Sequence, residues 1–104
     1  MPNYDSLKDK IAKMPGITAR QMFGYQCYST SGKFFVGFNN KNDWQVIVRL
    51  PKEEQQKAIK TNGIKPFSHG AKMGWAEIDT NHVTASVALK WIKKGHEFAR
   101  TLVK

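Results

Sequence analysis

The sequence predicts an α+β domain in which helices cover one face of an antiparallel sheet. The chain has 104 residues, 40% of them hydrophobic, which is enough for one core. Apolar residues recur every three or four positions near both ends, and β-rich runs separated by short turn sequences occupy the middle. We therefore expect a single domain over residues 1–104, in the order helix, three strands, helix, two strands, helix.

Local signals predict the first helix and the strands that follow it. Apolar residues at helical spacing run from Tyr4 to Met14 and stop at a "PG" pair. Residues 18–28, 33–39 and 44–50 are then rich in strand formers, and "STSG" and "NNKND" separate them as turns. Short turns between consecutive strands predict an antiparallel meander.

The second helix is expected to begin at Pro51, because proline suits the first helical position and two glutamates follow in the first turn. The helix should end at "TNG", with Gly63 as its C-cap. Residues 64–67 and 74–79 are predicted as two further strands, on either side of a loop.

The last helix has the clearest pattern. At 100° per residue its apolar residues fill one arc, which belongs to the core and has Trp91 at its centre. This arc contains Val87, Ala88, Trp91, Ile92, Gly95, Phe98, Ala99, Leu102 and Val103. The opposite arc is basic and contains Lys90, Lys93, Lys94, Glu97, Arg100 and Lys104.

The stretch "SGKFFVGF" has two interpretations. Strand alternation directs Phe34, Val36 and Phe38 to one face, as a wall of the core, and Phe35 and Gly37 to the other. The alternative is a base-stacking platform like that of the RNA-recognition motif, but that pattern matches only in part and its fold opens with a strand. We favour the core, and expect Phe35 on the sheet face that the helices leave bare.

The charge is strongly positive: 17 Lys and Arg against 8 Asp and Glu, a net charge of +9. Such a charge attracts polyanions, nucleic acid among them. A solvated lysine-rich surface with no such partner is the alternative, and composition alone does not separate the two.

No catalytic or metal constellation emerges from the sequence. The three histidines lie in different predicted elements, and Cys27 is expected to be a half-buried strand thiol. The start of the chain lacks the apolar core of a signal peptide, and no apolar run is long enough for a membrane span. We therefore expect a cytoplasmic protein without catalytic residues, cofactor or metal, and without a membrane partner.

The motifs "ARQMFGYQCYSTSGKFF", "VIVRLP", "GIKPF" and "GAKM", together with Trp91, resemble the N-terminal domain of the TfoX/Sxy family. These are bacterial proteins linked to competence gene regulation. The matching positions are Arg20, Met22, Phe23, Gly24, Tyr28, Gly32, Phe35, Arg49, Gly63, Pro66, Phe67, Met73 and Trp91.

The resemblance implies a secretion-chaperone-like α+β fold, a homodimer, and a non-enzymatic regulatory role with nucleic acid or a transcription-related protein as partner. Two departures stand out. Longer family members have a second, helical domain that residues 1–104 do not contain, and the family's Gly-Gly is Gly24-Tyr25 here.

Three candidate sites result. The bare sheet face, with Phe35 and Ile47, is the candidate dimer surface. The candidate nucleic-acid surface is the basic arc: Lys90, Lys93, Lys94, Arg100 and Lys104. In the alternative function, a binder or enzyme for a small anionic ligand, the pocket would be formed by Arg20, Arg49 and Lys72, unless each arginine pairs with an acid such as Glu77.

Overall fold

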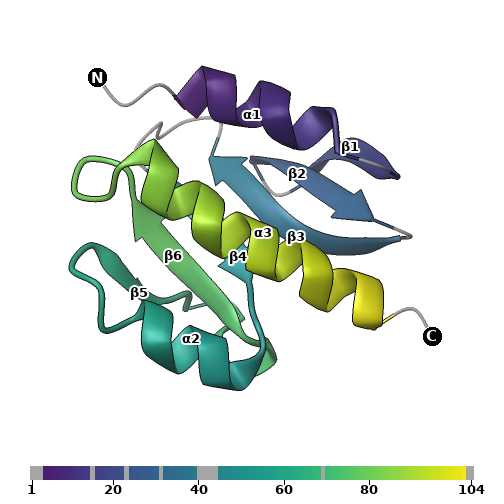
Figure 1. Ribbon diagram of the computed structural model, residues 1–104. Helices are drawn as coiled ribbons and strands as arrows, with labels where there is room; N and C mark the ends of the chain where they lie inside the picture. Colours follow the sequence, from purple (N-terminus) through teal and green to yellow (C-terminus); the bar gives the residue numbers. More distant parts are fainter. Residues whose placement is uncertain are drawn as a thin grey trace.

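The structure is a computed structural model that describes residues 4–14, 16–22, 24–30, 32–39, 45–68 and 70–102. It confirms the α+β class. A six-stranded antiparallel sheet with strand order β1-β2-β3-β4-β6-β5 has three helices on one of its faces (Figure 1).

The strands are β1 (Ile17–Met22), β2 (Tyr25–Thr30), β3 (Lys33–Asn39), β4 (Gln45–Arg49), β5 (Ile64–Pro66) and β6 (Trp75–Asp79). A short 3₁₀ turn, η1 (Ala71–Met73), lies between β5 and β6. The expected single strand over residues 18–28 is wrong, because the chain reverses at Gly24 and forms a hairpin there. Gly24 has φ +81°, a conformation that glycine adopts without the strain of a side chain. Trp44 of the expected third strand lies outside the described residues.

The helices are α1 (Tyr4–Ala12), α2 (Lys52–Ala58) and α3 (Ala85–Thr101). The hydroxyl of Thr84 caps α3 by accepting a hydrogen bond from the Val87 amide at 3.3 Å. Pro51 is the residue before α2 rather than its first helical residue. Buried residues of α1 and α3 pack on the sheet, with Leu7 and Ile11 contributed by α1.

A β-bulge in β3 corrects the predicted alternation of the aromatic stretch. Tyr28 of β2 pairs with Val36, but the next residue, Ser29, pairs with Phe34. Phe35 therefore has no residue opposite it. A bulge of this kind redirects a side chain, and it brings Phe35 and Val36 together on the helix-covered face.

Phe35 is consequently a core residue. Its side chain is fully buried, and its ring meets the ring of His96 in α3 edge-on, with the centroids 5.2 Å apart. Phe34 instead shares the open face and is half-buried. The expectation that Phe35 lies on the bare face is wrong. The preference for the core over a stacking platform holds for Val36 and Phe38, which are both buried.

Close contact between α3 and the sheet depends on a glycine. A Cβ atom at Gly95 would lie 2.8 Å from the carbonyl oxygen of Arg49 and 2.9 Å from Cγ2 of Val48. The apolar arc of α3 is confirmed at its centre, where Trp91 is only 6% exposed. At its ends, Val87 and Leu102 are exposed.

Candidate functional site

The outer surface of α3 presents three exposed cations, Lys90, Lys93 and Arg100, which we call the α3 stripe. Helical spacing of three and seven residues places them on one side, over about 15 Å of helix axis. No ion pair joins any of the three to a described residue. Glu97 lies between them and is also exposed.

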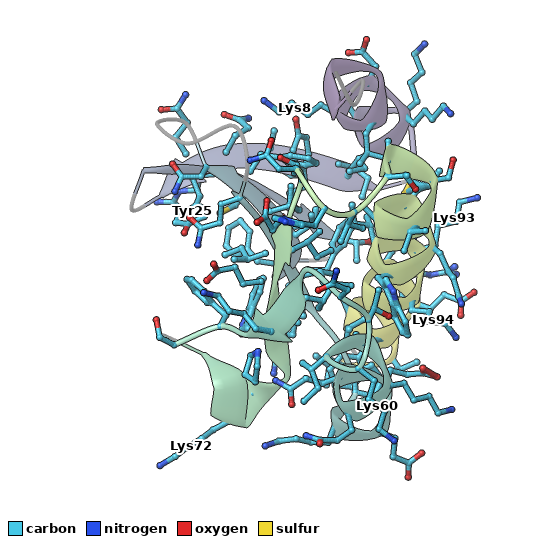
Figure 2. The ribbon with its side chains drawn as sticks, turned by 90° about the vertical axis from the view of Figure 1, so that its left-hand side faces the viewer. Lys8, Tyr25, Lys60, Lys72, Lys93 and Lys94 are labelled. Carbon is cyan, nitrogen blue, oxygen red and sulfur yellow. The ribbon has the colours of Figure 1, made fainter. Side chains whose placement is uncertain are left out.

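The excess positive charge of the helices is concentrated in α3. Each of α1 and α2 has two lysines and two acids, whereas α3 has three lysines and one arginine against one glutamate. Lys93 extends away from the sheet on the helix side, and Tyr25 and Lys72 lie on the opposite side (Figure 2). The stripe is therefore a distinct basic surface.

Two of the five cations predicted for the nucleic-acid surface, Lys94 and Lys104, are not part of the α3 stripe. Lys94 is half-buried, because its Nζ lies 3.4 Å from Oε1 of Glu54 in α2. Lys104 lies outside the described residues. The Nζ atoms of Lys90 and Lys94 lie 5.2 and 6.0 Å from the centroid of the Trp91 ring, so both ammonium groups pack near this buried indole.

A shallow groove of about 280 Å³ separates the C-terminal half of α3 from α2. It is lined by Pro51, Glu54, Lys94, Glu97, Phe98 and Thr101. Its one cation, Lys94, is already paired with Glu54, so phosphate contacts are favoured on the outer side of α3 rather than in the groove.

The sheet face without helices, the open face, carries one row of directly paired residues across all six strands. The row is Arg20, Cys27, Gly37, Ile47, Glu77 and Lys65, in sheet order. Cations occupy both ends of this row, and the residues at its centre are small or apolar. A Cβ atom at Gly37 would lie 3.1 Å from Cγ1 of Ile47 and 3.3 Å from Sγ of Cys27.

Two aromatic rings meet above this face. Tyr25 belongs to β2 and Phe67 follows β5, and three strands lie between these two. In a flat sheet this arrangement would separate the strands by about 19 Å. The ring centroids are 6.1 Å apart, so the sheet is curved and its open face is concave. We call these two rings the Tyr25–Phe67 pair.

The concave open face does not expose the expected apolar dimer surface. Ile47 is only 7% exposed although no helix covers it, and Phe35 is on the other face. The described residues that do expose large apolar side chains are Met73, Val87 and Leu102. The reason for expecting a homodimer through Phe35 and Ile47 is therefore removed.

Polar groups around the Tyr25–Phe67 pair are bonded to one another. Asn39 donates from Nδ2 to Oε1 of Gln45 at 2.6 Å. Burial raises the pKa of Tyr25 above its ordinary value, the hydrogen bond with Asn39 opposes this rise, and the charges of Glu77 and Cys27 add to it. Burial also raises the pKa of the Cys27 thiol, so the thiol is protonated at neutral pH and is a poor nucleophile.

The predicted anion pocket is not assembled. Arg20 and Arg49 share the open face by register, but β2 and β3 lie between their strands. Arg49 donates from Nε to the carbonyl oxygen of Met73 at 3.3 Å, and its guanidinium lies 5.7 Å from the centroid of the Phe98 ring.

Two arrangements were expected for these basic residues, a shared anion pocket or ion pairs of the arginines with an acid such as Glu77, and the structure has neither. Lys72, in η1, is exposed. Glu77, the expected partner of an arginine, pairs instead with Lys65 at 3.6 Å.

Sequence patterns gave no indication of the Tyr25–Phe67 pair, because its residues are 42 positions apart and meet only through the curvature of the sheet. The Glu54–Lys94 contact was missed for a similar reason. The sequence did contain one indication of close packing on the open face. Gly37 lies inside a strand, and a glycine there is typical of a close approach by another group.

Comparison with solved structures supports the fold. A Pseudomonas syringae protein solved as a structural genomics target superposes with a TM-score of 0.72, over 94% of this chain and 99% of that one, at 16% sequence identity. At that identity the likeness extends to the fold alone. No family model and no curated protein sequence matches the chain.

Two further properties concern the described ranges only. No group of three or more His, Cys, Asp or Glu side chains in them is arranged to hold a metal ion. None of the described helices is long and apolar enough to cross a membrane.

Proposed function

We propose that this chain is a non-enzymatic, cytoplasmic binding domain that contacts the phosphate backbone of nucleic acid through the α3 stripe. The observation that carries the proposal is the set of three exposed, unpaired cations on one side of α3, beside two helices whose charges balance. The resemblance to the TfoX/Sxy family supports a bacterial regulatory role, with a transcription-related protein as a further partner.

Electrostatics favours a duplex as the ligand of the stripe. A duplex presents one negative charge for about every 1.7 Å of its axis, so cations spread over about 15 Å of a helix reach several phosphates at once. α3 has no asparagine or glutamine to read the edge of an adenine, and Arg100 is its one arginine for a bidentate contact with a guanine. Binding should therefore depend strongly on salt and weakly on sequence.

The rival function, a small-anion binder or enzyme at Arg20, Arg49 and Lys72, is less favoured. These residues are on separate strands and a turn, and the Arg49 side chain is already engaged with Met73 and Phe98. A homodimer is not part of the proposal, since its expected surface is buried.

The test measures duplex DNA binding against salt concentration. We expect the triple variant Lys90→Gln, Lys93→Gln, Arg100→Gln to flatten the slope of log affinity against log salt by about 2.7, at about 0.9 for each phosphate contact. The matched control is Lys10→Gln, Lys13→Gln, Lys52→Gln, which removes the same charge from exposed positions outside the stripe.

The control variant should retain nearly the wild-type slope. An equal loss in both variants would show that only net charge matters, and that the stripe is not the site. If the wild type does not bind duplex DNA at 50 mM salt, where counterion release favours binding most, the proposed function is refuted.

A further inference from the structure

The open face has the parts of a second binding surface, unlike the α3 stripe in chemistry. It is concave, and the half-buried rings of the Tyr25–Phe67 pair lie over its centre. Aromatic rings on an antiparallel sheet are the groups on which unpaired bases stack. A base within a duplex does not offer its face to such a ring.

Charge on this face also favours a polyanion. Arg20 and Lys65 are exposed at the two ends of the row, and Lys72 is exposed on η1. The acids of this face are already paired: Glu77 with Lys65 at 3.6 Å, and Asp79 with His82 at 2.8 Å. Lys65 is thereby paired with Glu77, and Arg20 and Lys72 remain as the exposed cations of this face that no ion pair joins to a described acid.

We propose that the open face binds a short stretch of single-stranded nucleic acid, with one or two bases stacked on the Tyr25–Phe67 pair and phosphates near Arg20 and Lys72. The interaction is independent of the α3 stripe, because the two surfaces lie on opposite sides of the sheet (Figure 2).

The test uses fluorescence anisotropy with labelled twelve-nucleotide oligo(dT) and oligo(U). Tyr25→Leu and Phe67→Leu each remove a ring while retaining an apolar side chain, and each should weaken binding by about tenfold. The matched control is Tyr25→Phe, which keeps the ring and loses only the hydroxyl. It should bind within about twofold of wild type. A preference for one of the two oligonucleotides would indicate whether RNA or DNA is the ligand.

A second measurement uses the wild-type protein, so it does not depend on whether a variant folds. An oligonucleotide carrying 5-bromouracil is cross-linked by light and the linked residue is found by mass spectrometry. We expect the cross-link at Tyr25 or Phe67. Cross-links confined to α3, or folded leucine variants that bind as wild type does, would overturn the proposal.

The stripe variant separates the two functions. Lys90→Gln, Lys93→Gln, Arg100→Gln should lose duplex binding and retain the effect of the rings on single strands. If the stripe variant instead loses both equally and the ring variants lose neither, the open-face proposal fails while the proposed function stands. If no duplex binding is found but the rings bind oligo(dT), the proposed function fails while the open-face proposal stands.

Discussion

The two faces of the sheet bury their central residues by different means. On the helix-covered face, α3 packs so closely that Phe35, Val48 and Ile92 are completely buried in an apolar layer. On the open face, Ile47 and Glu77 are also nearly inaccessible, yet no helix lies above them. The sheet curves toward this face, and the Tyr25–Phe67 pair lies over it. A buried residue therefore does not identify the face that forms the main core.

The β-bulge in β3, which places Phe35 on the helix-covered face and Phe34 on the open face, can be tested with two alanine variants. Phe35→Ala should lower the free energy of unfolding by about 3–5 kcal/mol, because it empties a fully buried site against α3. Phe34→Ala, on the open face, should cost about 1 kcal/mol. Chemical denaturation of both variants measures the difference. Equal losses, or a larger one for Phe34, would contradict the redirected side chain.

The packing of the two faces can also be compared through one glycine on each, Gly95 of α3 on the helix-covered face and Gly37 on the open face. Gly95→Ala should destabilise the domain by about 1–2 kcal/mol despite the better helix propensity of alanine, because the new methyl meets a backbone carbonyl. Gly37→Ala meets only side-chain atoms of Ile47 and Cys27, at 3.1 Å or more, which need to shift by only a few tenths of an ångström, and it should cost less than about 1 kcal/mol. Thermal unfolding of the two variants gives the order, and the reverse order would mean that the open face is packed more rigidly.

The smallest expected effect concerns alkaline pH. Burial, with the nearby charge of Asp9, raises the pKa of Tyr28 on the helix-covered face. The neutral phenol is therefore favoured in the folded state, and this stability is complete below the ordinary tyrosine pKa of about 10 and is lost as pH rises above it.

Tyr28→Phe should flatten the loss of stability above pH 10. Tyr25→Phe should flatten it too, because burial also raises the pKa of Tyr25. Cys27 is retained in both variants, since its raised pKa contributes to the earliest part of the loss. Denaturation midpoints from pH 8 to 11 measure the loss, and a variant that loses stability as steeply as the wild type would contradict the raised pKa at its position.

Sequence patterns predicted the fold class, the three helices and the buried side of α3, because these depend on local spacing. They failed at Gly24 and Phe35. A single positive-φ residue divided one expected strand, and a bulge reversed the expected facing of two phenylalanines. Alternation assumes an unbroken ladder, and a bulge depends on how two strands fit each other.

The candidate sites were predictable to different extents. The cations of α3 follow from helical periodicity, and the structure alters only the status of Lys94, through a contact 40 positions away. The open face was not predictable. Its aromatic pair and its paired acids depend on which strands are neighbours and on how far the sheet curves.

Phosphate binding by the α3 stripe is tested by a titration of ¹⁵N-labelled protein with duplex DNA at 50 mM salt, followed by amide resonances. We expect the shifted amides to cluster from Lys90 to Arg100 and those of the open-face row, such as Gly37 and Ile47, to stay in place. Shifts spread evenly over all three helices, or centred on the open face, would contradict a phosphate-binding surface on α3.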